Sequence, residues 1–285
     1  MMPEHSISHQ HRDEVAAGQR FEFGVNWSRF LSTLTEDKIV RAEASLKQNL
    51  SLENMEGLRF LDIGSGSGLF SLAARRLGAT VHSFDYDSDS YICTKGLRAR
   101  YFADDPKWIV EQGSVLDRDY VAGLGRFDVV YSWGVLHHTG AMWTALDNAS
   151  IAAENGALLF IAIYNDQGKR SRRWTTVKRA YNRLPGPLKF VVLWPSFLAL
   201  WGKRLLKDLL LMQPGRSWRA DIDRGMSPWH DVVDWVGGYP FEVAKPEEIF
   251  RFFRDRGFQL REMTTQAGDL GCNEFIFRKQ TASSE

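Results

Sequence analysis

Cysteine is scarce in this chain of 285 residues, and long apolar runs are missing from it. Two cysteines, Cys93 and Cys272, are too few for a disulfide framework or a zinc cluster, so both are expected to stay reduced. The uncharged run 190–202 has 13 residues, whereas about 20 are needed to span a bilayer. Residues 1–18 contain no apolar stretch of signal-peptide type, which predicts a mobile tail on a cytoplasmic protein.

One long stretch lacks acidic residues. The chain has 36 lysines and arginines against 35 acids, a formal net charge of +1, but residues 167–207 hold eleven bases and no acid. The rest of the chain contains 25 bases and 35 acids, so the near-neutral net charge conceals a strongly basic segment. The length and the 44% hydrophobic content suit one well-buried core with an elaboration.

A glycine-rich turn follows an apolar run in the first third of the chain. Residues 60–68 read Phe-Leu-Asp-Ile-Gly-Ser-Gly-Ser-Gly, and a predicted helix over 70–77 follows. Glycines let the backbone turn sharply and approach a ligand, and a helix N-terminus presents amides to it. Asp85 comes 21 residues after Gly64, near the interval at which a second-strand acid meets ribose hydroxyls. The pattern predicts a nucleoside site.

Two departures from the G-x-G-x-x-G pattern of dinucleotide-binding proteins indicate which kind of nucleoside the site binds. The third glycine comes one residue early, at Gly68, because Leu69 occupies its usual place. Asp62 precedes the turn, where its charge would repel a pyrophosphate and attract an ammonium group. This acid-x-G-x-G-x-G segment resembles the first motif of class I S-adenosylmethionine-dependent methyltransferases.

The resemblance implies an α/β fold: a doubly wound, seven-stranded, mostly parallel sheet with an antiparallel last strand. Strand-like runs alternate with helical stretches, as a parallel sheet requires, and the last two runs are joined by a loop short enough for a hairpin. The predicted strands after the first cover 80–84, 108–111, 127–132, 157–163, 258–265 and 274–279, with a connecting helix over 246–256. We expect a methyltransferase domain over 56–285, interrupted by a basic and aromatic helical insertion over 168–240.

The resemblance also implies S-adenosylmethionine as the cofactor, with Asp62 and the turn at its methionine end and Asp85 at its ribose. The residues expected to contact it are Trp27, Asp62, Gly64, Ser65, Gly66, Ser67, Gly68, Asp85, Tyr86, Gly113, Ser114, Val115, Ser132, Trp133, Gly134 and His137. Asp117 could bond the adenine amine or could be a turn aspartate. Both interpretations stay open.

Residues 19–55 are expected to form a helical lid. Aromatic side chains gather around 21–31, and Phe23, Asn26 and Trp27 are the residues placed over the cofactor. A lid would exclude water and protect a reactive sulfonium. Alternatively, these aromatics simply pack against the edge of the sheet.

The insertion allows three interpretations. It could be a substrate cap, it could contact an anionic membrane or receive a lipid-linked acceptor through 169–207, or it could form a homodimer interface. Pro185, Pro187 and Pro195 are expected to break it into short pieces. No recognisable RNA-binding module accompanies it, so no nucleic-acid partner is expected.

Three histidines are candidates for a general base: His137 and His138 after the fourth strand, and His230 beside Asp231. The same histidine pair is widespread in similar sequences, so a role in shaping the cofactor site is also open. His82 lies within a predicted strand and is interpreted as packing. His5, His9 and His11 are not expected to bind a metal.

The resemblance also narrows the acceptor. The Ser132-Trp133-Gly134-Val135 segment lacks the motif of nucleic-acid base methylation and the aspartate of metal-assisted catechol methylation. Two separated cysteines do not supply the set that arsenic methylation needs. A methyltransferase acting on an oxygen of a small-molecule or glycan acceptor, without a catalytic metal, is therefore expected. A non-catalytic module that binds the same cofactor is the alternative.

Overall fold

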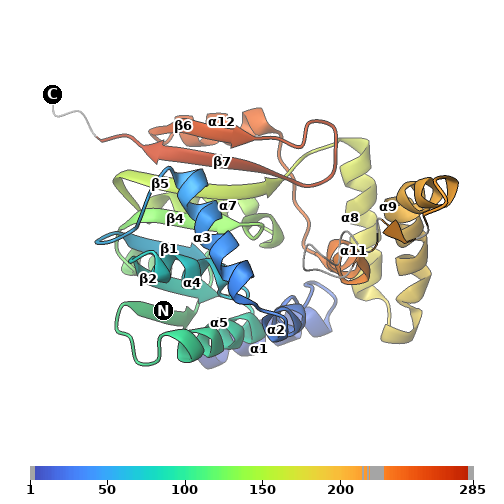
Figure 1. Cartoon of the computed structure of the whole chain (residues 1–285), viewed down its shortest axis with the longest axis horizontal. Helices are drawn as coiled ribbons and strands as arrows, with labels where there is room; N and C mark the ends of the chain where they lie inside the picture. The colour runs from blue at the N-terminus through green and yellow to red at the C-terminus, as the bar shows by residue number, and fades with distance from the viewer. Residues whose placement is uncertain (1–3, 214, 217, 219–227, 282–285) are drawn as a thin grey trace.

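A seven-stranded sheet organises the computed structural model, which describes residues 4–213, 215, 216, 218 and 228–281. Its strand order is β3-β2-β1-β4-β5-β7-β6, and only β7 is antiparallel to its neighbours, β5 and β6. The strands are β1 (Arg59–Ile63), β2 (Thr80–Asp85), β3 (Trp108–Gln112), β4 (Phe127–Trp133), β5 (Ala153–Tyr164), β6 (Phe258–Thr264) and β7 (Cys272–Lys279). The predicted fold class is confirmed (Figure 1).

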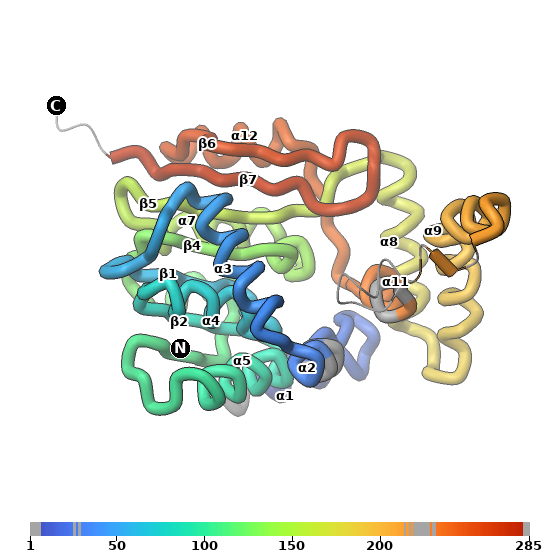
Figure 2. Tube along the Cα trace, in the orientation of Figure 1, coloured from blue at the N-terminus to red at the C-terminus, as the bar shows by residue number. Residues whose placement is uncertain are grey.

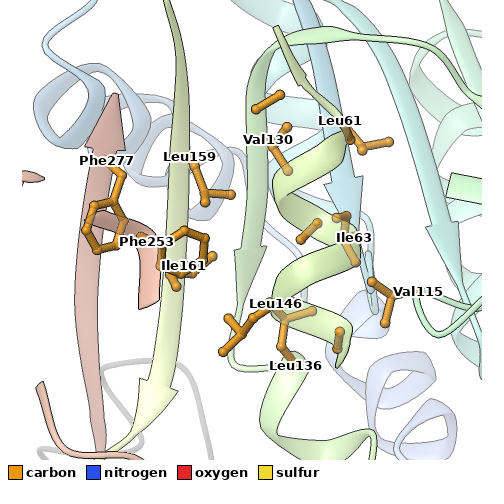
Figure 3. Packing of buried hydrophobic residues seen from close by; sticks show 14 of the residues in the cluster. Leu61, Ile63, Val115, Val130, Leu136, Leu146, Leu159, Ile161, Phe253 and Phe277 are labelled. Carbon is orange, nitrogen blue, oxygen red and sulfur yellow. The ribbon is translucent and has the colours of Figure 1, made fainter. Parts of the chain in front are cut away.

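Helices cover both faces of this sheet and divide the core into two apolar clusters. On one face, α3 (Glu36–Leu50), α4 (Leu69–Arg76) and α5 (Ser88–Tyr101) bury residues such as Ile39, Leu72 and Leu97. On the other, α6 (Arg118–Gly123), α7 (Met142–Ile151) and α12 (Pro246–Arg254) contribute Val121, Leu146 and Phe253. Figure 3 shows part of this second cluster against β1, β4, β5 and β7.

The predicted strands match the observed ones within one or two residues, except at β5. This strand starts at Ala153, four residues before the predicted start, because its first residues pair with β4 across an irregular register between Phe127 and Val129. Asn155 and Gly156 lie in that stretch and hid its strand character. From Ala157 to Ile163 every residue of β5 is buried, as expected for an interior strand with two covered faces.

The N-terminus differs from the predicted mobile tail. Residues Glu4–Ala16 form helix α1, and Ile7 and His11 on it are buried. Ser8 Oγ donates to Gln112 Oε1 at 2.7 Å, and Glu14 accepts hydrogen bonds from Arg20 and Tyr86. Mainly polar contacts hold this helix in place. The sequence therefore carries no apolar periodicity from which the helix could be predicted. Helix α2 (Gly24–Ser32) follows and packs on α5.

The insertion forms its own helical group beside the sheet (Figure 1), built from α8 (Lys169–Arg183), the short 3₁₀ segment η2 (Gly186–Leu188), α9 (Phe190–Leu210) and α11 (Pro228–Gly237). Its aromatic core includes Phe197, Trp201 and Trp218. The Tyr239–Pro240 peptide that follows α11 is cis.

The expectation that proline would break the whole insertion was wrong for Pro195. This residue lies inside the 21-residue helix α9. It is the sixth residue of the helix, so it removes one early amide-to-carbonyl bond while its fixed φ suits the helix. Of the three prolines named above, Pro185 and Pro187 lie between α8 and α9.

Lys178 anchors the insertion to the rest of the molecule. It is fully buried, donates to the Trp235 carbonyl and lies over the rings of Trp235 and Phe241 at 4.2 and 4.6 Å. Burial lowers the pKa of this ammonium well below its ordinary value. The contact joins α8 to α11 and to the segment returning toward the sheet.

Replacing Phe253 should test the core beneath α12. Its ring is fully buried and lies 4.7 Å from that of Phe277, so Phe253→Ala is expected to cost about 3–5 kcal/mol of unfolding free energy. Met263→Ala, at a side chain 44% exposed, should change it by less than about 0.5 kcal/mol. Urea unfolding of both variants measures the difference, and equal losses would contradict this assignment.

Candidate cofactor and acceptor site

A cavity of about 790 Å³ opens at the carboxyl ends of β1, β2 and β4. Ligands of open α/β sheets bind at this edge, and the volume falls within the range of small-molecule pockets. Four groups of residues line it: the glycine turn with Asp62, the end of β2 with Asp85 and Tyr86, the segments after β3 and β4, and aromatic side chains from the N-terminal segment.

The glycine turn is shaped for close backbone approach. Gly64 has φ +76°, and a Cβ on it would lie 2.3 Å from Val135 Cγ1. The amide of Gly66 donates to Asp85 Oδ2 at 2.9 Å, which ties the turn to the end of β2. Trp27 covers the turn, since a Cβ on Gly66 would lie 3.0 Å from its indole ring. A side chain at Gly64 would collide with Val135, and one at Gly66 would press on Trp27, so this packing requires glycine at both positions.

Asp62 is a buried carboxylate in the cavity wall. Ser71 donates a hydrogen bond to it, and Ser71 is in turn bonded to Ser83. Burial raises the pKa of Asp62 to about 7, while the bonds from Ser71 oppose that shift. A cationic group entering the cavity would stabilise the ionised form, which suits the ammonium partner predicted for this residue.

Asp85 and Asp87 hold the second side of the cavity. Asp85 accepts from the amides of Gly66 and Asp87, both at 2.9 Å. Asp87 caps α5 through the amides of Asp89 and Ser90 and also accepts from the amide of Gly24. Burial, and then the neighbouring Asp87, raise the pKa of Asp85 to about 7. The acids thus connect the glycine turn, α5 and α2.

The segment after β3 forms a further wall. Gly113, Ser114, Val115 and Asp117 all line the cavity. Asp117 accepts from the amide of Tyr120 at 3.0 Å and begins α6 as its N-cap. One carboxylate oxygen of Asp117 thus has the role of a turn aspartate. Because Asp117 also lies on the cavity wall, a contact between its other oxygen and the adenine amine stays a proposal.

The two histidines after β4 differ in position. His138 lines the cavity, and its Nδ1 lies 2.6 Å from the Pro240 carbonyl, so Nδ1 carries the proton. His137 is fully buried behind the cavity wall, where its Nδ1 accepts from the Tyr164 amide and its carbonyl accepts from the Glu242 amide. Burial, and then the charge of Lys178, lower the pKa of His138 to about 3.

The N-terminal segment and the insertion meet over His138. Arg20 Nη1 donates to the His138 carbonyl at 2.8 Å, and the ring of Phe23 lies 5.0 Å from that of His138. The Phe21 amide donates to the Tyr239 carbonyl at 2.9 Å, and its ring fills the space where a Cβ on Gly237 would stand. The segment 20–23 therefore closes this end of the cavity.

Thirteen of the sixteen residues expected to contact the cofactor line this cavity, and three lie behind its wall: Gly68, Ser132 and His137. Gly68 begins α4 and packs against Thr94, while Ser132 Oγ donates to the Ile63 carbonyl. His230 belongs to α11, but its side chain lies outside the described residues, as does that of Asn26 in α2. The described residues include no group of three or more potential metal ligands.

Several lining residues were not expected from the sequence. They are the aromatic residues Phe21, Phe30, Phe70 and Tyr131, and Gln10, His11 and Glu14 of α1. The aromatic cluster around 21–31 was a usable signal for Phe21 and Phe30. Helix α1 gave none, because its docking depends on polar pairs that single residues do not reveal.

The comparisons with known proteins agree with this geometry. The family model described as "Methyltransferase domain" matches residues 34–191, more than half of the chain. The chain belongs to this family. A ubiquinone biosynthesis O-methyltransferase of Brucella ovis is 34% identical over 119 residues, which cover 39% of this chain and 43% of that relative. The match thus spans less than half the length of the relative.

Solved structures resemble the chain at low sequence identity. The [4+2]-cyclase SpnF is 12% identical, with a TM-score of 0.52 over 85% of this chain and 81% of that one. Magnesium protoporphyrin IX methyltransferase of Synechocystis PCC 6803, solved with bound SAH, is 14% identical, with a TM-score of 0.49 over 86% and 83%.

S-adenosylmethionine is the cofactor, as the family indicates, and the residues present fit it. The glycine turn lines the cavity, and the buried Asp62 has a raised pKa and a hydroxyl for its partner, which suits an ammonium group. Asp85 retains lone pairs for hydroxyl groups after accepting its two amides. S-adenosylmethionine supplies an electrophilic methyl group when bound.

Binding of S-adenosylhomocysteine should release protons through Asp62. With a pKa of about 7, this carboxyl is more than half protonated at pH 6.5, and the ammonium group of the ligand favours its ionised form. Calorimetric titration at pH 6.5 in buffers of contrasting ionisation enthalpy counts those protons.

Asp62→Asn should release fewer protons than the parent and bind more weakly, whereas Asp119→Asn, at an exposed site on α6, should match the parent. Undiminished proton release by Asp62→Asn would show that this carboxyl does not meet the ammonium group.

Proposed function

We propose that this protein transfers a methyl group from S-adenosylmethionine to a hydroxyl oxygen of a small molecule, with His138 as the general base. The position of His138 carries the proposal. Its ring lines the same cavity as the glycine turn, and its Nδ1 is already committed to the Pro240 carbonyl. The lone pair of the neutral imidazole is therefore on Nε2, the nitrogen available to an acceptor.

The lowered pKa of His138 determines at which stage of methyl transfer the acceptor hydroxyl loses its proton. At a pKa of about 3 the imidazole is neutral at pH 7 but is too weak a base to ionise an ordinary hydroxyl first. Transfer of the methyl group to the acceptor oxygen would break its bond to the sulfonium sulfur and leave S-adenosylhomocysteine, so the oxygen would gain positive character and its proton would become strongly acidic. His138 Nε2 then accepts this proton, which leaves a neutral ether and an imidazolium held by the Pro240 carbonyl.

The N-terminal segment gives the reaction a dry site. Phe21, Phe23, Trp27 and Phe30 all line the cavity, and Trp27 lies directly against the glycine turn. Removing water strengthens electrostatic interactions and protects an electrophilic methyl group from hydrolysis. We therefore assign the role of a lid to residues 20–32, with α1 as its outer support. The rest of the expected lid over 19–55 packs as α3 on a face of the sheet and does not line the cavity.

The acceptor class rests on two supports. The Brucella ovis relative is named an O-methyltransferase, although the match covers 43% of it. The cavity wall is mainly aromatic and apolar beside the oriented imidazole of His138, which suits a ring-bearing hydroxyl compound. A phenolic acceptor is accordingly the proposed substrate class. A glycan hydroxyl is the other acceptor to assay, because the same proton transfer would serve it.

Thermal stability measured with ligands tests the cofactor assignment. S-adenosylhomocysteine at 100 times its dissociation constant should stabilise the folded chain by about 2.7 kcal/mol and raise the melting temperature by several degrees. NADH should leave it unchanged. Stabilisation by NADH alone would contradict the assignment. Stabilisation by S-adenosylhomocysteine without methylation of any phenol, catechol or sugar in a panel would favour a non-catalytic cofactor-binding module.

Replacing His138 tests the base. His138→Asn keeps an amide that can donate to Pro240 but removes the accepting nitrogen, so turnover should fall about 10²–10⁴-fold with S-adenosylhomocysteine affinity little changed. His82→Asn, at a partly buried residue paired with Glu111, is the matched control and should retain turnover. A larger loss in His230→Asn than in His138→Asn would transfer the role to His230.

A further inference from the structure

Exposed apolar side chains concentrate on one part of the insertion. The described residues include sixteen large apolar side chains that are exposed, and ten of them lie between positions 188 and 212. Three are among the most exposed: Leu209 at 67%, Leu210 at 75% and Met212 at 89%. The ten are Leu188, Phe190, Val191, Trp194, Leu198, Leu206, Leu209, Leu210, Leu211 and Met212.

Helix α9 is apolar on its outer face as well as its inner one. The inner face buries Leu193, Phe197 and Trp201 in the aromatic core of the insertion. The outer stripe consists of Val191, Trp194, Leu198, Leu206 and Leu209, which recur mostly at three- or four-residue spacing. A helix that is apolar all round normally has both faces covered. Among the residues that the structure describes, each member of this outer stripe is more than half exposed, although the Trp194 ring also lies 5.7 Å from that of Trp229.

Basic residues surround the stripe. Lys203, Arg204 and Lys207 are exposed along the second half of α9, and Lys189 precedes its first turn. The segment 167–207 contains no acid, and the next acid, Asp208, is buried. Helix α8 adds exposed bases at Arg170, Arg172, Arg173 and Arg183. The apolar surface therefore has a rim of positive charge, which an anionic surface complements.

This surface is separate from the cavity. None of the described residues of 168–240 lines the cavity, and α9 lies at the far side of the insertion from the sheet (Figures 1 and 2). Among the described helices, none has the length and apolarity to cross a bilayer. A helix of this kind, with tryptophan and leucine beside lysine and arginine, suits the plane of a membrane interface.

We propose that the outer stripe of α9 binds in the interface of an anionic lipid bilayer. Val191, Trp194 and Leu198 enter the boundary between headgroups and acyl chains, while Lys203 and Lys207 contact anionic headgroups. Burial of the apolar side chains and attraction of the bases act together, as in other interfacial helices. The charged rim favours this occupant over a second copy, since two copies would bring their basic segments together.

Vesicle flotation tests this proposal independently of methyl transfer. The full chain should float with vesicles that contain phosphatidylglycerol and phosphatidylcholine. Each base that contacts an anionic headgroup should strengthen binding about five-fold, so binding to phosphatidylcholine alone should be at least ten times weaker. Trp194→Ser/Leu198→Ser/Leu206→Ser should reduce partitioning by about ten-fold or more. Lys203→Gln/Lys207→Gln should reduce it by roughly 25-fold, and 0.5 M salt should weaken the parent.

Matched controls carry the same substitutions elsewhere. Val40→Ser/Ile92→Ser/Ile109→Ser changes exposed apolar residues of α3, α5 and β3, and Lys95→Gln/Lys107→Gln changes exposed lysines. Both should float like the parent. Unchanged melting temperatures would show that the α9 variants remain folded.

Two results would overturn the proposal. The first is that the parent protein floats neither with the anionic vesicles nor with phosphatidylcholine vesicles. The other is a concentration-dependent dimer in light scattering that the α9 apolar variant dissociates, with vesicle binding unaffected by either α9 variant. That second result would assign the stripe to a homodimer interface.

Discussion

Two carboxylates buried at the strand ends are the constraint on which this site depends. Asp62 and Asp85 have a hydroxyl and backbone amides as hydrogen-bond partners, and the pKa of each is raised to about 7. Burying a carboxylate costs free energy unless hydrogen bonds or a cation compensate. Here the hydrogen bonds tie Asp62 to α4 and Asp85 to the glycine turn, and the remaining deficit favours a ligand with an ammonium group. The same acids thus stabilise the cavity wall and select the cofactor.

The second organising contact lies at the opposite end of the cavity, where His138 donates to the Pro240 carbonyl. Pro240 is the last residue of the insertion, and Arg20 holds the carbonyl of His138 from the N-terminal side. The Pro240 carbonyl fixes which imidazole nitrogen carries the proton, and Arg20 fixes the backbone of the same residue. An insertion that lines none of the cavity through its described residues therefore still orients the proposed base.

Sequence reasoning predicted the sheet, the glycine turn and both acids because their signals are local. A strand is visible in its apolar run, and a turn that needs positive φ shows its glycines, as Gly64 and Gly66 do. It did not predict helix α1, nor that His138 rather than His137 lines the cavity. Those outcomes depend on pairs such as Ser8 with Gln112 and His138 with Pro240, which are more than 100 residues apart. Neighbouring histidines in a 3₁₀ turn point to different sides, and composition cannot say which faces the ligand.

The positions of the cavity and of α9 bear on how an apolar acceptor would enter. The lid segment 20–23 contacts both His138 and the end of α11, so the lid and the insertion share one seam. The aromatic core of the insertion joins α9 to α11, and the buried Lys178 joins α8 to α11. Packed side chains therefore connect α9 through α11 and Phe21 to the seam beside His138. The exposed face of α9 and the cavity lie at the two ends of this packed path, and different residues form each.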